Sequence, residues 1–226
     1  MQYPNLEEEK KLWKKGYECV VGLDEVGRGP LAGPVVAGAV FIKSPSTSSG
    51  QAALKILIKG INDSKKISEK KREEIFDILV KHKDVKWGIG IVSEKEIDKI
   101  NILKATKLAM KKAVTALTLK MDGRPLLKSE VFLLIDGNFS VDFIVRHNQK
   151  AIIKGDQKVI SISAASIIAK VTRDRLMKKF HKKFSQYGFD KHKGYGTAFH
   201  IEMIEKHGPC DIHRRSFAPI SSLSIK

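Results

Sequence analysis

Acidic side chains follow three apolar runs of this sequence, and their placement is the pattern best suited to chemistry. Asp24 and Glu25 come directly after one run, Asp136 after a second, and Asp156 shortly after a third. Ligands collect at the carboxyl ends of the strands in α/β sheets. Clustered carboxylates repel each other, and oxygen-only ligand sets select hard cations such as Mg²⁺ or Mn²⁺. Together the four acids predict a divalent-metal site, although each acid taken singly is better explained by capping a turn or pairing with a lysine.

The adjacent pair Asp24 and Glu25 sets a condition on the backbone. Neighbouring residues on a regular strand point to opposite faces of the sheet. The two carboxylates can converge only if the chain leaves regular geometry at this point, and the turn expected over residues 26–29 permits that.

A glycine–proline segment follows this pair at once, over residues 27–34. Its first residues fit the dinucleotide-binding pattern G-x-G-x-x-A, but that pattern must open a helix. Pro30 and Pro34 interrupt the segment and a β-type run comes next, so a nucleotide-binding loop is excluded. We expect instead a loop whose backbone N–H groups approach a phosphodiester, with Arg28 alongside.

The elements that position these residues can be placed from apolar periodicity and capping signals. Short apolar runs rich in β-branched residues predict strands at 19–23, 35–42, 85–92, 131–135 and 151–153. Helices are predicted at 69–80 after a Ser68 cap, from a capping box at Ser93 to about residue 120, at 163–180 and at 199–206. The first two strands form a hairpin-like pair, and strands then alternate with helices. This order predicts an α/β domain with a mixed sheet flanked by helices.

The charge of the chain points to a polyanionic partner. Its 226 residues include 42 Lys or Arg against 25 Asp or Glu, which gives a formal net charge of +17. Lys and Arg neutralise phosphates and release counterions from nucleic acid. Lysines that merely solvate helix faces would give the same composition, so charge alone names no reaction.

The same sequence excludes several classes of protein. No run approaches the roughly 18 consecutive apolar residues that a membrane span needs. The N-terminal segment is charged throughout and lacks the apolar region of a secretory signal. The two cysteines, Cys19 and Cys210, cannot make a disulfide framework. We therefore expect a protein of the reducing cytoplasm that acts without a membrane and as a monomer.

Two further groups of residues have weaker claims to chemistry. His207, Cys210 and His213 are spaced as zinc ligands, but no fourth ligand lies at the spacing of a structural site. We expect this segment to contribute packing instead. Asp174 lies on the helix predicted at 163–180, where an ion pair that supports the scaffold is the expected role.

Residues 22–34 (GLDEVGRGPLAGP) closely resemble the opening motif of bacterial ribonuclease HII. Further matching segments follow in family order. They are NDSKK at 62–66, INIL at 100–103, IDGN at 135–138, KGDQK at 154–158, AASIIAKV at 164–171, RDR at 173–175, HKGYGT at 192–197 and HRRSF at 213–217. The resemblance thus extends over residues 19–219. Val26 stands where the family often has Ala, and residues 44–59 form a longer segment than the family usually carries.

The resemblance implies an RNase H-like fold with a C-terminal helical extension. Residues 1–18 would form a short N-terminal extension, residues 19–180 the catalytic domain and residues 181–226 a substrate-binding extension of it. The implied enzyme cleaves the RNA strand of RNA/DNA hybrids and cuts 5′ of ribonucleotides embedded in duplex DNA. Its products would carry 3′-hydroxyl and 5′-phosphate ends.

The resemblance also implies roles for the acids. Asp24, Glu25 and Asp136 fall on the metal-binding acids of the family, with Mn²⁺ or Mg²⁺ as the cofactor. Asp156 falls on the fourth catalytic carboxylate, a role for which the resemblance favours Asp156 over Asp174. Two hard cations roughly 3.5–4 Å apart can activate a water and stabilise the leaving 3′-oxygen.

Substrate contacts are implied in the same way. The backbone of Gly27, Arg28 and Gly29 would read the ribose 2′-hydroxyl, and Tyr195 would contact the sugar on the DNA side of the junction. From the residues alone, Tyr195 serves equally well as an aromatic anchor for its glycine-rich loop. Phosphate contacts are expected from Lys65, Lys66, Lys170, Lys193 and Arg215, each of which is also explained as surface charge.

Two other hypotheses compete with a ribonuclease. One is a basic nucleic-acid-binding protein whose acids are structural, and the other is a phosphodiester enzyme of the same fold, such as a resolvase or transposase, that acts on all-DNA substrates. The glycine loop directly after the paired acids favours the ribonuclease.

Overall fold

The structure, a computed structural model, describes residues 4–44, 68–121, 131–144 and 148–222. Its strands form one sheet in the order β3-β2-β1-β4-β5. They are β1 (Cys19–Val26), β2 (Val35–Ile42), β3 (Val85–Val92), β4 (Val131–Asp136) and β5 (Gln149–Ile152). β2 pairs antiparallel with both β1 and β3, whereas β4 pairs parallel with both β1 and β5. The predicted hairpin and mixed sheet are confirmed.

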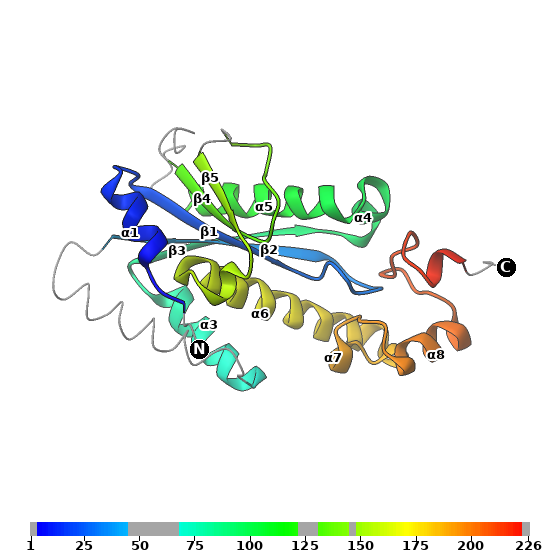
Figure 1. The fold of residues 1–226 in the computed structure, drawn as a ribbon. Coiled ribbons are helices and arrows are strands. Elements are labelled where there is room, and N and C mark those ends of the chain that lie inside the picture. Colours follow the sequence, from blue (N-terminus) through cyan, green and yellow to red (C-terminus); the bar gives the residue numbers. More distant parts are fainter. Residues whose placement is uncertain (1–3, 45–67, 122–130, 145–147, 223–226) are drawn as a thin grey trace.

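Helices cover both faces of this sheet. They are α1 (Glu7–Lys14), α3 (Glu69–Lys81), α4 (Glu94–Ile100), α5 (Ile102–Thr118), α6 (Ile160–Lys183), α7 (Phe189–His192) and α8 (Ala198–His207), with short 3₁₀ turns η3 (Gly155–Gln157), η4 (Ser185–Tyr187) and η5 (Ile220–Ser222). Figure 1 shows α4 and α5 along one face, α3 and α6 along the other, and α7 and α8 beyond the end of α6. Among the described residues, no helix is long and apolar enough to cross a membrane.

Small residues let the two main helices approach the sheet closely. A Cβ placed on Gly22 would lie 2.2 Å from the carbonyl carbon of Ser161, so α6 packs on β1 backbone to backbone. On the other face, a Cβ on Gly90 of β3 would lie 1.9 Å from the carbonyl oxygen of Ala109 in α5. A larger side chain at either glycine would push the helix off the sheet.

The core residues of the central strands alternate between the two faces, as a period of two requires. Leu23 and Ile135 belong to the apolar cluster that includes α5. Val20 and Leu134 belong to a cluster on the opposite face, together with Ile162 of α6. This alternation decides which face each acid at the strand ends will occupy.

One predicted element was wrong. The Ser93 side chain accepts a hydrogen bond from the Glu96 amide at 3.3 Å, as the capping box predicted, but the helix ends at Ile100. Asn101 has a positive φ of 66° with an extended ψ of 163°, and its side chain caps α5 through the Lys104 amide at 3.1 Å. The long helix expected from Ser93 to about residue 120 is therefore two helices, because a residue with positive φ cannot continue an α-helix.

Other boundaries differ less. β1 continues to Val26 rather than stopping before Asp24, β5 begins at Gln149, and α7 was not predicted. α6 runs to Lys183, through the boundary expected at residue 180, so the proposed division of the chain stays a prediction. The segment 44–59, apart from residue 44, and the residues Lys65 and Lys66 lie outside the described residues.

The N-terminal segment is bound to the start of α6. The Asn5 amide donates to the Lys158 carbonyl at 3.0 Å, and the Ile160 amide donates to the Asn5 carbonyl at 3.1 Å. Glu9 of α1 is buried, and its Oε1 accepts the Ser161 amide at 2.9 Å. A carboxylate at a helix N-terminus satisfies an amide that the helix itself leaves unpaired.

We predict that Gly22→Ala destabilises the protein, because the added methyl group would overlap the Ser161 backbone. The expected loss is roughly 1–3 kcal/mol or more, the usual result of overpacking a well-packed core. Urea unfolding followed by circular dichroism measures it. Lys86→Ala, at an exposed position of β3, is the control and should stay within about 0.5 kcal/mol. Equal unfolding midpoints for the two variants would contradict the close packing of α6 on β1.

Candidate active site

Asp24 and Asp136 lie side by side on the face of the sheet that α6 covers. Leu23 pairs with Ile135 at the end of the parallel β1–β4 ladder, so the next residue of each strand is an aspartate. Because Leu23 and Ile135 face α5, their successors face α6. The two strands thereby bring together two carboxylates that are far apart in the sequence.

Asp24 is the more deeply buried of the two, with 6% of its surface exposed. Its Oδ1 accepts the Glu25 amide at 2.7 Å, and the Ser166 side chain on α6 hydrogen-bonds to the carboxyl group. Burial holds the pKa of Asp24 well above its usual value, the Ser166 bond opposes the shift, and the charges of Asp136 and Glu25 add to it. A cation placed at this carboxylate would relieve both burial and repulsion.

Asp136 is held by the turn that follows β5. Its Oδ1 accepts the Gly155 amide at 2.6 Å and the Asp156 amide at 3.4 Å. These amides begin η3, directly after Lys154, which has a left-handed conformation with φ of 56°. The turn brings the backbone of Asp156 to the Asp136 carboxylate, at the edge of the sheet where Asp24 also lies.

Glu25 occupies the other face. β1 keeps regular pairing with β2 through Val26, so the departure from strand geometry expected at Asp24 and Glu25 does not occur. The Oε1 of Glu25 lies 3.1 Å from the Arg28 guanidinium, while its buried Oε2 has no hydrogen-bond partner. Burial raises the pKa of Glu25, the neighbouring Arg28 lowers it, and Asp136 raises it.

The donor set fits a hard divalent cation. Carboxylate oxygens are the ligands that Mg²⁺ and Mn²⁺ prefer. The mutual repulsion of the acids and the unpartnered Oε2 of Glu25 are features that a cation would satisfy. Within the described ranges, no group of three or more His, Cys, Asp or Glu side chains is already arranged to hold a metal ion. Ligation by all the acids therefore requires their side chains to reorient.

Two buried arginines hold the glycine loop beside these acids. The Arg214 guanidinium donates to the carbonyls of Gly27 at 2.5 Å, Arg28 at 2.8 Å and Gly33 at 3.0 Å. Arg173 of α6 donates to further carbonyls, those of Pro34 at 2.9 Å, Ala32 at 3.1 Å and Lys193 at 2.9 Å. Neither arginine was predicted to have a role, because nothing in a single sequence separates a buried arginine from a surface one.

The loop leaves backbone donors available. Arg28 and Gly29 are exposed, and their amides donate to no backbone carbonyl in the part of the chain that the structure describes. Tyr195 lies next to them: its ring atom Cε1 is 3.8 Å from the position of a Cβ on Gly29, and 45% of its surface is exposed. The amide of Leu31 also donates to the Gly194 carbonyl at 2.8 Å. The structure thus places the predicted tyrosine and the predicted glycine loop together.

The residues predicted to contact phosphates differ in their exposure and in their partners. Lys170 lies 2.8 Å from Asp174, which is ion-paired as expected, and Arg215 is exposed with its guanidinium on the Pro209 carbonyl. Lys193 is buried, and its ammonium group donates to the Asp190 carbonyl. This ammonium group also lies 3.8 Å from the Glu69 carboxylate, and the phosphate contact expected of Lys193 stays a prediction.

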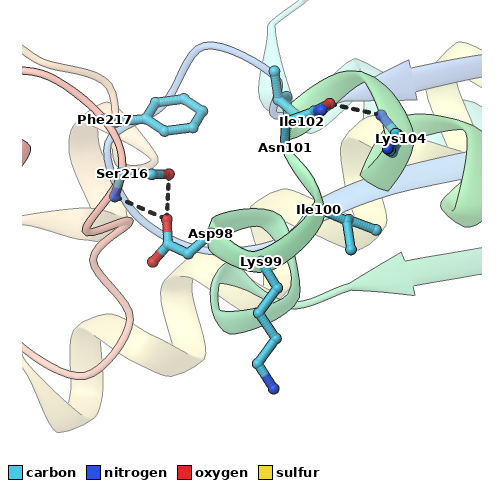
Figure 2. A pocket seen from close by; sticks show the side chains of 8 residues that line it. All are labelled: Asp98, Lys99, Ile100, Asn101, Ile102, Lys104, Ser216 and Phe217. Atoms are coloured by element: carbon cyan, nitrogen blue, oxygen red, sulfur yellow. Dashed lines mark hydrogen bonds between the residues drawn. The ribbon is translucent and has the colours of Figure 1, made fainter.

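A cavity of about 460 Å³ lies between the α4–α5 junction and residues 216–217. Figure 2 shows Asp98 reaching across it to Ser216, whose amide donates at 3.0 Å and whose hydroxyl donates at 2.5 Å. Phe217 lines the same cavity and packs under the Arg214 guanidinium, 4.9 Å from it. Asp98 therefore holds the segment that contains Arg214 in place through its hydrogen bonds to Ser216.

The zinc spacing at residues 207–213 has a packing role, as predicted. His213 is buried and accepts the Cys210 amide on Nδ1 at 2.9 Å, while His207 is exposed. Among the described residues neither cysteine forms a disulfide, and burial raises the pKa of the Cys210 thiol to about 11.

The sequence and the structure were compared with those of known proteins. The family model described as Ribonuclease HII matches residues 21–220. A ribonuclease HII of Chlamydia caviae is 49% identical over 212 residues, which cover 94% of this chain and 90% of the relative. Ribonuclease H2 of Pyrococcus horikoshii OT3 has a similar structure, with a TM-score of 0.66, 28% identity, and coverage of 90% of this chain and 96% of that one.

A more distant structure agrees in fold. Bst-RNase HIII, solved in complex with Mn²⁺, has a TM-score of 0.69 and 18% identity, and the match covers 91% of this chain and 68% of that one. The RNase H-like fold expected from the sequence is confirmed.

Removing one of the crowded charges should stabilise the metal-free protein. Asp136→Asn keeps the acceptor for the Gly155 amide and removes the charge that raises the pKa of Asp24 and Glu25. In EDTA we expect the melting temperature to rise by about 2–4 °C, the shift that ~1 kcal/mol gives in a chain of this size. Scanning calorimetry measures it, with the exposed Asp77→Asn on α3 as the control. A lower melting temperature for Asp136→Asn would contradict the repulsion.

Proposed function

Because the chain belongs to the ribonuclease HII family of metal-dependent ribonucleases H, we propose that it cuts duplex DNA 5′ of embedded ribonucleotides. This extends the family activity on RNA/DNA hybrids, and the products carry 3′-hydroxyl and 5′-phosphate ends. Family membership disfavours both a binding protein with structural acids and a resolvase or transposase.

The main support for this proposal is the glycine loop that lies beside the acids. To distinguish RNA from DNA, a protein must sense the 2′-hydroxyl. The amides of the exposed residues Arg28 and Gly29 donate to no backbone carbonyl among the described residues, and Gly27 follows the acid-bearing strand directly. A ribose that donates or accepts at this loop places its adjacent phosphodiester near Asp24 and Asp136. Tyr195, packed beside Gly29, supports the neighbouring deoxyribose.

The acids form the metal site in this proposal, and Asp24, Glu25 and Asp136 are its ligands. Bound Mg²⁺ or Mn²⁺ would supply Lewis-acid activation of the water and the phosphodiester. The chain's own hydrogen bonds fix the ligands: Ser166 orients Asp24, and the Gly155 amide orients Asp136. Asp156, whose amide also approaches Asp136, is the fourth catalytic carboxylate.

Basic residues near the loop complete the binding surface. Arg28 and Arg215 are exposed, and the net charge of +17 suits a polyanionic duplex. Lys170 contributes if the substrate phosphate replaces Asp174 as its partner. The contact expected from Lys65 lies outside the described residues, and a monomeric, cytoplasmic enzyme stays a prediction.

A labelled DNA duplex with one ribonucleotide tests the function. With Mg²⁺ we expect a single cut 5′ of the ribonucleotide, loss of the cut in EDTA, and no cut in the all-DNA duplex. Asp136→Asn should reduce the rate roughly a hundredfold or more, since a metal ligand supplies several kcal/mol of transition-state stabilisation.

Asp77→Asn, an exposed carboxylate on α3, is the matched control and should leave the rate unchanged. Cleavage of the all-DNA duplex at the same rate would contradict recognition of the 2′-hydroxyl. Binding of the duplex without cleavage under every divalent cation would leave a binding protein in place of the enzyme.

A further inference from the structure

Three histidines pack against each other below the loop that carries Tyr195. The rings of His192 and His200 stack with centroids 4.4 Å apart, and the Nε2 atoms of His200 and His213 lie 3.0 Å apart. His200 and His213 are buried. The residues come from α7, α8 and the segment after α8, so only the fold brings them together.

The hydrogen bonds of this group determine where each proton sits. The Cys210 amide donates to Nδ1 of His213 at 2.9 Å, so His213 carries its hydrogen on Nε2. That hydrogen is donated to Nε2 of His200, which leaves the His200 hydrogen on Nδ1. Nδ1 of His200 lies 2.9 Å from the carbonyl oxygen of Tyr195 and donates to it. A continuous series of hydrogen bonds therefore connects Cys210, His213, His200 and Tyr195.

Burial keeps the imidazole rings of His200 and His213 neutral. It lowers the pKa of His200 to about 4 and that of His213 to about 3; His192 adds to the lowering at His200, and both His200 and His192 add to it at His213. Tyr187 and Phe189 exclude water, with ring centroids 4.9 Å from His213 and 5.4 Å from His200 respectively. At neutral pH each ring is thus one donor and one acceptor, as this series of hydrogen bonds requires.

His192 holds the other side of the same loop. Its Nδ1 accepts the Gly194 amide at 3.2 Å, and its Nε2 bonds to the Tyr187 carbonyl at 2.6 Å. Histidine side chains therefore bind the amide of Gly194 and the carbonyl of Tyr195, one on each side of the tyrosine. Tyr195 itself is exposed, so its backbone is fixed from below while its ring remains available beside Gly29.

We propose that His200 is a positioning residue for Tyr195: with His213 it fixes the tyrosine backbone so that the ring packs on the deoxyribose next to the cleaved ribonucleotide. His200 touches no substrate and acts through Tyr195 alone. The inference rests on the proposed function for its consequence in catalysis, but the positioning itself can be measured without substrate.

Two substitutions at His200 separate its hydrogen bond to Tyr195 from its hydrogen bond to His213. In His200→Asn the side-chain N–H takes the place of imidazole Nδ1 and keeps the bond to the Tyr195 carbonyl. In His200→Gln the amide reaches the place of Nε2, so it keeps the His213 contact and loses the one to Tyr195. Both remove the ring, which makes them matched for lost packing.

The first readout is ¹⁹F NMR of 3-fluorotyrosine-labelled protein, with the Tyr195 signal assigned by Tyr195→Phe. We expect His200→Gln to shift and broaden this signal, and His200→Asn to leave it near its original position. If His200→Gln fails to fold, His213→Asn, which keeps an acceptor for the Cys210 amide but removes the donor to His200 together with the ring, should broaden the same signal. An unchanged Tyr195 signal in His200→Gln, or equal changes in both His200 variants, would overturn the proposal.

The second readout is a double-mutant cycle on the duplex with one ribonucleotide. His200→Gln should raise KM about three- to tenfold, the effect of one hydrogen bond, with little change in kcat. In a Tyr195→Ala background the same change should have no further effect, whereas an equal effect there would overturn the proposal.

The cycle also separates this inference from the proposed function. Tyr195→Ala alone should raise KM. If it does not, the substrate contact of Tyr195 fails, while the ¹⁹F result still decides whether His200 positions it.

Discussion

Two buried guanidinium groups determine the geometry on which the rest of this protein depends. Arg173 and Arg214 bind the carbonyls of the glycine loop, and each also joins a distant part of the chain to it. Burying a charge costs several kcal/mol unless hydrogen bonds replace water, and the loop carbonyls provide that replacement. Burial lowers their pKa values to about 10 for Arg173 and about 9 for Arg214, so both stay charged at neutral pH. The loop, α6 and the C-terminal segment consequently form one unit.

A second, opposing constraint acts next to this unit. Parallel pairing of β1 with β4 places Asp24 and Asp136 together, where burial and repulsion both disfavour the charged form of Asp24. Ser166, the Gly155 amide and close packing of α6 on Gly22 hold the carboxylates there nonetheless. A site assembled against its own repulsion is a common property of metal-dependent active sites, because the cation supplies the missing charge.

Much of this arrangement was readable from the sequence, for physical reasons. Apolar runs ending in acids predicted the strands and the site edge, and the Ser93 cap was correct because capping is a local interaction. The break at Asn101 was missed because its positive φ has no signature in helix periodicity. Burial of Lys193 and the roles of Arg173 and Arg214 depend on contacts between segments distant in sequence. The face of Glu25 likewise required knowing that β1 extends to Val26.

The most direct test of this account is a crystal structure of Asp136→Asn bound to a DNA duplex that contains one ribonucleotide. The account predicts the ribose 2′-hydroxyl at roughly 3 Å, hydrogen-bond distance, from the backbone of residues 27–29. The phosphodiester 5′ of that ribonucleotide should face Asp24, with the Tyr195 ring on the adjacent deoxyribose. A ribonucleotide bound away from the glycine loop, with the strand path displaced from Asp24, would contradict it.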